Sequence, residues 1–263
     1  MRENKVKGML QAGQVPVGTN IFEFRTTGIA RIAAAAGVDF LMFDLEHTGW
    51  SMETIRMLLA TARAVDAPPF VRVPATQYHF MARALDLGAM GIMVPMVETE
   101  EQARSLIEFS KYPPDGRRGT CFAVAHDDYL DGDIAEKMRS ANREVLLIAQ
   151  IETARGLENV EKIAAVDGID VLWIGHFDLT TSMGIPGQFQ SPRYLEAVDR
   201  VIAASKRHRK SVGIMVSSPE QGEQAVLQGF RILLYWADLW IYRQALSQGV
   251  KGLRERIRSE RPS

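Results

Sequence analysis

The chain has 263 residues, of which 46% are hydrophobic and 24% charged, and its formal net charge is −1. This is an ordinary globular composition, and the balanced charge gives no reason to expect nucleic acid or an anionic membrane as a partner. No apolar run approaches the roughly 18 residues of a membrane span, the charged N-terminus does not read as a secretory signal, and the lone Cys121 cannot form an internal disulfide. We therefore expect a cytoplasmic protein.

Short apolar runs alternate with helical patterns along the chain. Eight near-continuous hydrophobic runs are typical of parallel strands covered on both faces, and they fall at residues 15–19, 39–43, 70–73, 91–96, 145–151, 171–175, 211–216 and 230–236. Helical patterns fall between them at 29–36, 52–65, 78–87, 99–109, 156–165, 192–208 and 219–228, and a last, extended helix is expected at 238–259. This alternation predicts a single α/β domain over residues 1–263, a (β/α)₈ TIM barrel. The alternative, a doubly wound open sheet, lacks its usual G-x-G-x-x-G loop.

The connection between the fourth and fifth strands is too long for one helix. After the helix at 99–109 it holds a Pro- and Gly-marked loop at 112–119 and a second helical stretch near 131–140, so that an insertion spans about 110–142. Long insertions of this kind are often functional loops or lids. We therefore expect the insertion at the catalytic end of the barrel.

Two carboxylates each follow a strand-like run, and one helix separates the two runs. Glu152 follows the run at 145–151, and Asp178 lies just beyond the run at 171–175. Neighbouring parallel strands present their carboxyl ends at one rim, so these side chains could hold a divalent cation that keeps open positions for a substrate. Alternatively, Glu152 is a solvated cap or an ion-pair partner, and Asp178 caps the helical turn at 179–183.

Further polar residues fall at the same rim, where barrels carry their chemistry. Asp44, Glu46 and His47 follow the second strand, Arg72 lies on the third, and Gln150 precedes the fifth-strand glutamate by two residues. Each has a structural alternative, since Arg72 could simply pair with Glu46 and His47 could serve only packing. Their common position favours one site that combines a base, a guanidinium group and carboxylates.

Two other barrel chemistries are disfavoured. A Schiff-base aldolase needs a lysine on a strand inside the barrel, and no lysine falls in a predicted strand. A phosphosugar enzyme normally has glycine-rich loops after strands seven and eight, whereas residues 217–220 and 237–240 contain no glycine.

Six segments, in order across most of the chain, resemble the metal-dependent (class II) pyruvate aldolases of the HpcH/HpaI aldolase family, within the phosphoenolpyruvate/pyruvate superfamily. They are Phe43-Asp-Leu-Glu-His47, Val71-Arg-Val-Pro74, Gly88-Ala-Met-Gly-Ile-Met-Val-Pro-Met96, Arg118-Gly119, Gln150-Ile-Glu-Thr153 and Gly175-His-Phe-Asp-Leu179. The sequence departs from the family pattern in two places. His176 follows Gly175 where the family commonly has proline, and residues 233–238 are bulkier than the usual glycine-containing strand.

The resemblance implies a role for each matching residue. It implies Glu152 and Asp178 as ligands of Mg²⁺ or Mn²⁺, with other divalent ions as alternatives, and Arg72 beside the keto oxygen. His47, with Asp44 nearby, matches the family's acid/base pair. The implied substrate-binding positions are Gln150, Gly175, His176 and Phe177. The resemblance also implies a homo-hexamer of dimers that exchange C-terminal helices.

The implied reaction is the reversible cleavage of a 4-hydroxy-2-oxo acid into pyruvate and an aldehyde. Candidate substrates are a 2-keto-3-deoxy sugar acid and 4-hydroxy-2-oxoheptanedioate. His176 could touch the substrate or fill the pocket wall, and Arg118 could meet the aldehyde fragment or anchor its loop. The alternatives are an acyl-CoA lyase of the citrate lyase β type, which usually lacks the Glu46-His47 pair, and a non-catalytic barrel. The aldehyde, the stereochemistry at C4 and the metal stay open.

Overall fold

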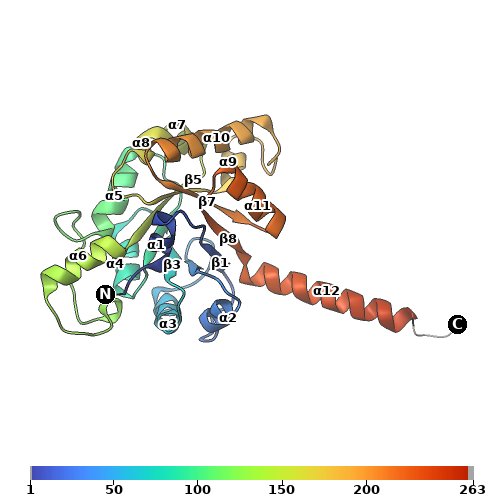
Figure 1. Ribbon diagram of the computed structural model, residues 1–263, viewed down its shortest axis with the longest axis horizontal. Helices are drawn as coiled ribbons and strands as arrows, with labels where there is room; N and C mark the ends of the chain where they lie inside the picture. Colours follow the sequence, from blue (N-terminus) through green and yellow to red (C-terminus); the bar gives the residue numbers. More distant parts are fainter. Residues whose placement is uncertain (1, 260–263) are drawn as a thin grey trace.

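Eight parallel strands close into a barrel in the computed structural model, which describes residues 2–259 (Figure 1). In chain order the strands are β1 (Val17–Ile21), β2 (Phe40–Asp44), β3 (Pro69–Arg72), β4 (Gly91–Val94), β5 (Leu146–Ile151), β6 (Val171–Ile174), β7 (Ser211–Val216) and β8 (Ile232–Ala237). Each strand pairs with the next, and β8 pairs with β1. The prediction of a (β/α)₈ barrel is confirmed.

Helices surround the barrel and cover the outer face of its sheet (Figure 1). They are α1 (Lys5–Gln11), α2 (Ile29–Ala35), α3 (Met52–Ala62), α4 (Tyr78–Asp86), α5 (Glu100–Ser110), the short 3₁₀ helix η1 (Ala125–Asp127), α6 (Ile134–Glu144), α7 (Ala154–Glu158), α8 (Val160–Ala164), α9 (His176–Ser182), α10 (Pro192–Arg207), α11 (Pro219–Gln228) and α12 (Asp238–Ser259). Helix α1 was not predicted. Its Val6 is buried in the cluster that fills the barrel interior, so α1 closes the amino-terminal end.

Alternate residues of each strand point to opposite faces, and this alternation builds the site. Phe40 and Met42 of β2 belong to the interior cluster, whereas Leu41 and Phe43 pack with the helices. The same two-residue period carries Asp44 to the inner side of the carboxyl-terminal rim. The hydrophobic pattern of the strands therefore fixes which polar side chains face the mouth of the barrel.

Strands β1 and β8 each begin two residues later than predicted. Strand β1 spans Val17–Ile21 instead of 15–19, and β8 spans Ile232–Ala237 instead of 230–236. The shift carries Asn20 and Phe22 to the mouth of the barrel, where both line its cavity. The predicted strands began too early because apolar residues also precede each strand in the sequence. Those residues continue the hydrophobic pattern but come before the residues that are paired in the sheet.

The insertion is anchored at the amino-terminal end of the barrel, so the prediction of a lid at the catalytic end is wrong. Asp128 accepts hydrogen bonds from Arg2 Nε at 3.1 Å and from Arg63 Nη2 at 2.8 Å. At the end of α6, the carbonyl of Glu144 accepts from Asn4 Nδ2 at 3.0 Å. The physical reason is topological: α5 runs back down the outside of the barrel, and a helix-to-strand connection returns at the amino ends of strands.

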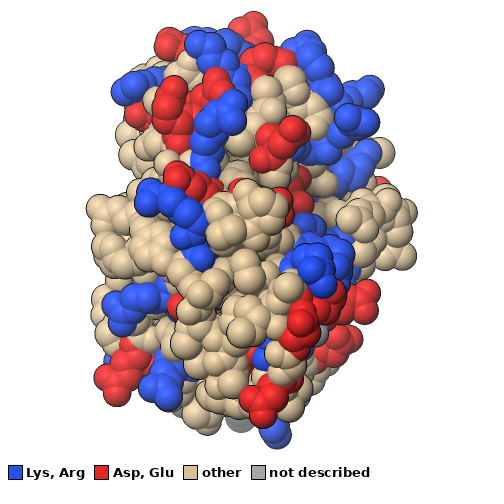
Figure 2. All heavy atoms as spheres, turned by 90° about the vertical axis from the view of Figure 1, so that its left-hand side faces the viewer, with Lys and Arg blue, Asp and Glu red and all other residues tan. Residues whose placement is uncertain are grey.

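Helix α12 leaves the barrel and extends away from it (Figure 1). Five apolar side chains spaced three or four residues apart are exposed along it, namely Tyr242, Leu246, Val250, Leu253 and Ile257. On another face of the molecule, acidic and basic side chains lie among one another around a region of uncharged residues (Figure 2). No helix within residues 2–259 combines the length and apolar character that a membrane crossing requires.

Candidate active site

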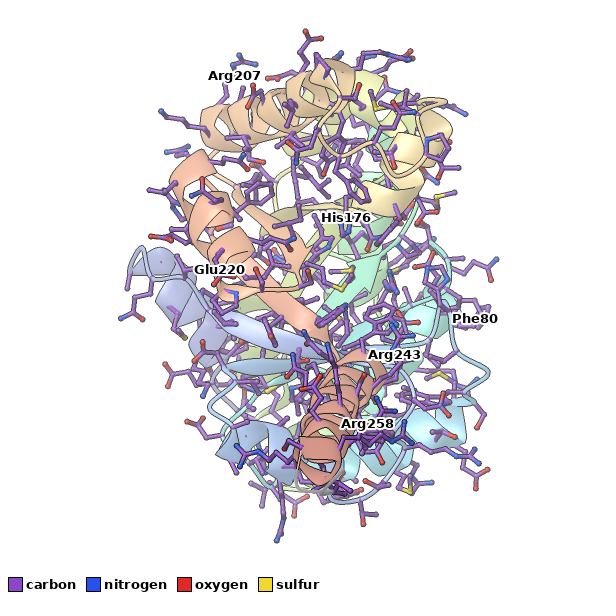
Figure 3. The ribbon with its side chains drawn as sticks, turned by 90° about the vertical axis from the view of Figure 1, so that its right-hand side faces the viewer. Phe80, His176, Arg207, Glu220, Arg243 and Arg258 are labelled. Carbon is purple, nitrogen blue, oxygen red and sulfur yellow. The ribbon has the colours of Figure 1, made fainter. Side chains whose placement is uncertain are left out.

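A cavity of about 740 Å³ lies at the carboxyl ends of the strands. Most of the rim residues predicted from sequence line it: His47, Arg72, Gln150, Gly175, His176, Phe177 and Asp178. Figure 3 shows the face from which α12 projects, with His176 lying near its centre and Arg243 of α12 below it. Barrel closure therefore brings residues from β2, β3, β5 and β6 to one place.

Glu152 is buried and tightly held at the end of β5. Its Oε1 accepts a hydrogen bond from the backbone N–H of Met96 at 2.7 Å, and its Oε2 accepts from Gln150 Nε2. Met96 has a positive φ of 54°, a conformation that costs on the order of 1–3 kcal/mol at a non-glycine residue. A side chain at Gly175 would occupy the space of the Glu152 carboxylate, so this position requires glycine.

The surroundings of Glu152 suit a cation. Burial raises the pKa of Glu152 to about 7. The hydrogen bonds from Gln150 and Met96 oppose this rise, and the negative charges of Glu46 and Asp178 add to it. Asp178 is exposed in the first turn of α9, and Gln150 Oε1 is buried without a hydrogen-bond partner among residues 2–259. These oxygens are the hard donors that Mg²⁺ and Mn²⁺ prefer. In the described part of the chain no cluster of three or more His, Cys, Asp or Glu side chains that could hold a metal ion occurs.

Arg72 is held by two carboxylates of the segment that follows β2. Its Nε donates to Asp44 Oδ2, and its Nη1 lies 3.1 Å from Glu46 Oε2. Asp44 is fully buried, and its other oxygen accepts from the backbone N–H of His47 at 2.6 Å. The guanidinium group is therefore fixed in position before any substrate binds.

The carboxylate nearest to the His47 ring is Glu46, with 3.6 Å between His47 Nε2 and Glu46 Oε2. The sequence-based pairing of the ring with Asp44 is thus corrected: Asp44 contacts the His47 backbone and Arg72 instead. Burial is the main cause that raises the pKa of Glu46 to about 7, and the neighbouring Arg72 opposes it. The sequence analysis placed Glu46 at this rim but assigned it no catalytic role.

His176 forms part of an apolar wall at the start of α9. Its ring lies 4.6 Å from the Phe177 ring and 5.2 Å from the Phe189 ring, centroid to centroid. Burial lowers the pKa of His176 to about 4, so the imidazole is neutral at physiological pH. This packing favours the pocket-wall interpretation of His176.

Arg118 lies outside the cavity, so the prediction that it contacts substrate is wrong for this chain. It is buried, its Nη2 donates to Asp86 Oδ1 at 2.6 Å, and its guanidinium carbon lies 4.6 Å from the centre of the Tyr112 ring. With Arg63 and His126 it lines a separate small cavity. The reason is again the placement of the insertion at the amino-terminal end.

Carboxylates, an arginine and a histidine at the carboxyl-terminal mouth of a closed barrel define an α/β-barrel enzyme. The profile of the family described as HpcH/HpaI aldolase/citrate lyase matches residues 24–236, and the chain belongs to this family. The predicted resemblance is confirmed, and the family supports the predicted lyase class.

Named relatives agree with this assignment. The chain is 35% identical to a 4-hydroxy-2-oxovalerate aldolase of Novosphingobium aromaticivorans, over 98% of this chain and 97% of the relative. It is 30% identical to a 5-keto-4-deoxy-D-glucarate aldolase of Klebsiella pneumoniae subsp. pneumoniae, over 92% and 93%. The crystal structure of an HpcH/HpaI aldolase from Desulfitobacterium hafniense DCB-2 is similar with a TM-score of 0.91 and 31% identity, covering 98% of this chain and 97% of that one.

Proposed function

We propose that this protein is a divalent-cation-dependent aldolase that reversibly cleaves a 4-hydroxy-2-oxo acid into pyruvate and an aldehyde. The observation that carries the proposal is the cavity at the mouth of the barrel, which His47, Arg72, Gln150 and Asp178 line together, with the Glu152 carboxylate buried and hydrogen-bonded to Gln150. The aldolase names of the two relatives described above support the same reaction class.

Glu152 and Asp178 would hold Mg²⁺ or Mn²⁺, with Gln150 beside them. The bound cation would supply Lewis-acid stabilisation of the 2-oxo oxygen. The first residues of α9, Gly175 to Phe177, line the cavity next to Asp178. The backbone N–H groups of His176 and Phe177 would receive the substrate carboxylate, since that of Gly175 already donates to the Ile151 carbonyl at 3.3 Å.

Arg72 would donate hydrogen bonds to the 2-oxo oxygen. Breaking the C3–C4 bond leaves an electron pair that delocalises onto this oxygen as an enolate, and protonation of C3 then gives pyruvate. Because Asp44 and Glu46 fix the guanidinium group beforehand, the donor is preorganised where charge develops. Such a donor is typically worth on the order of 10²–10³ in rate.

His47 would accept the C4 hydroxyl proton as the aldehyde forms. Its side chain is 53% exposed and lines the cavity, so the ring can reach a substrate. Glu46 lies near enough to orient the imidazole and to stabilise its protonated form. This assigns to Glu46 the supporting role that the family resemblance implied for Asp44.

The exposed stripe of α12 supports a homo-hexamer of dimers that exchange C-terminal helices. An apolar groove of about 770 Å³ lies between α10 and α11, with Leu195, Val198 and Ala225 in its lining. A partner's α12 would cover this groove and bury its own stripe. We also keep a cytoplasmic location as a prediction.

A coupled pyruvate assay across a panel of 4-hydroxy-2-oxo acids tests the proposal. Chelator should abolish pyruvate release, and Mg²⁺ or Mn²⁺ should restore it. Full activity in excess chelator would reject the metal role. Carbon–carbon cleavage of a hydroxyacyl-CoA, with no pyruvate from any member of the panel, would favour the citrate lyase β alternative. No turnover of either class of substrate would favour a non-catalytic barrel.

A further inference from the structure

The cavity has two unlike halves. Most of the polar groups come from β2, β3, β5 and β6, as described above, and Asn20 of β1 adds one amide. The other half is built by the end of β1, by β8 and by the start of α12, and it presents Phe22, Leu234, Leu239 and Trp240. Because β8 pairs with β1 and β1 pairs with β2 in the closed barrel, these residues form one continuous side of the mouth that adjoins the Arg72 side.

Asp238 fixes the apolar half in place. This buried carboxylate accepts hydrogen bonds from the backbone N–H groups of Phe22, Glu23 and Phe24 at 3.0, 3.0 and 2.7 Å. It also accepts from the N–H of Leu239 in its own helix at 2.8 Å. One side chain thus ties the loop after β1 to the start of α12, and the wall is formed in advance of binding.

Aromatic rings extend from the Arg72 side of the cavity toward the neighbouring groove, which Trp236 and Trp240 both line. The Arg72 guanidinium carbon lies 5.7 Å from the centre of the Phe22 ring. The Phe22 ring lies 5.6 Å from Trp240, which lies 6.3 Å from Trp236. Trp236 has a positive φ of 45° beside the register shift between β1 and β8, as expected where a bulge re-aims a side chain. A substrate substituent that extends from Arg72 toward this side therefore contacts the rings of Phe22 and Trp240.

The charges on this side do not suit an anion. Two charged residues from the loop after β1 line the cavity, Glu23 and Arg25; they have opposite signs and both are exposed. Arg72 is already paired with Asp44 and Glu46. A distal carboxylate bound here would lose water without gaining a buried cation among the described lining residues, which is unfavourable.

We infer that the aldehyde half of the site takes an apolar aldehyde, with an aromatic ring or an aliphatic chain, in preference to a carboxylate-bearing semialdehyde. The inference rests on the proposed aldolase function and selects among its substrates. In the synthetic direction, C3 of pyruvate loses a proton, the C3–C4 bond forms, and the aldehyde oxygen gains a proton. The product is the sum of the two substrates, and the aldehyde substituent lies along the Phe22–Trp240 wall.

The test compares kcat/KM for hexanal and benzaldehyde with that for succinic semialdehyde and glycolaldehyde, using pyruvate and the full, Mn²⁺-loaded enzyme. An apolar pocket distinguishes substrates by about 10–200-fold for each methylene group, so we expect at least a tenfold preference for hexanal. Trp240→Ala should lower the hexanal-to-glycolaldehyde ratio at least tenfold. Tyr129→Ala, an exposed aromatic of the insertion, is the matched control and should leave the ratio unchanged.

Exchange of the pyruvate C3 protons in D₂O, followed by NMR, separates this inference from the proposed function. If the C3 protons exchange but the enzyme prefers succinic semialdehyde, and Arg25→Gln abolishes that preference, the inference is overturned and the aldolase proposal stands. Exchange with equal use of all four aldehydes would also overturn the inference. Absence of both exchange and pyruvate release would refute the aldolase proposal, and this inference with it.

Discussion

Replacing Glu152 by glutamine removes a charge that the fold buries, and the metal-free protein should become more stable at alkaline pH. Burial raises the pKa of Glu152 from 4.5 to about 7. The folded state therefore holds this proton more tightly than the unfolded state does. The stability from the protonated group is fully present below pH 4.5 and is lost as the pH rises through 7. At about 1.36 kcal/mol per pKa unit, ionised Glu152 costs the metal-free fold roughly 3 kcal/mol at pH 8.

A glutamine at position 152 can form hydrogen bonds with the same two neighbours as Glu152, Met96 and Gln150. Its oxygen can accept from Met96 N–H, and its new NH₂ group can donate to Gln150 Oε1, which is buried without a partner among residues 2–259, once the Gln150 amide turns. We expect Glu152→Gln to be roughly 3 kcal/mol more stable than the parent protein at pH 8 in chelator, and about equal at pH 4.5.

Thermal unfolding followed by circular dichroism at both pH values measures this difference. For a chain of this size the difference corresponds to roughly 6–12 °C in Tm. Glu196→Gln, on the exposed face of α10, is the matched control and should show neither effect. A Glu152→Gln protein that is less stable than the parent at pH 8 in chelator would refute the reasoning.

Arg72→Lys should lower kcat by about 10²–10³, because a point charge cannot replace a planar group that pairs with both Asp44 and Glu46; near-normal turnover would remove Arg72 from the mechanism. Borohydride added with pyruvate should leave activity unchanged, whereas a trapped lysine adduct found by mass spectrometry would overturn the class II assignment. Arg118→Met should reduce Tm by leaving Asp86 and the Tyr112 ring without their partner, with KM unchanged for the folded enzyme; a raised KM with Tm unchanged would return Arg118 to the substrate site.

Much of the candidate site could be predicted because it follows from local pattern. Continuous apolar runs mark strands covered on both faces, and the two-residue period then places Gln150 and Glu152 on the side that faces the mouth. The order of strands was also predictable, since consecutive parallel strands joined by helices lie side by side. These inferences required no knowledge of which side chains touch.

The errors at the site involve contacts or paths that local pattern does not encode. Asp44 and Glu46 have the same strand parity, and only the positions of Arg72 and His47 in space decide which carboxylate each one meets. Arg118 was assigned to the site by motif, but the path of the chain after α5 determines the end of the barrel at which it lies.

The sequence by itself determined the barrel, the family and the two acidic side chains at its mouth, because burial periodicity and short motifs are local properties of the chain. Only the tertiary structure decided the partner of His47, the location of the insertion and the aromatic half of the cavity. Phe22 and Trp240 lie near opposite ends of the sequence, and they meet because β8 closes the barrel against β1. Closure is a property of all eight strands together, so no local segment could have shown that contact.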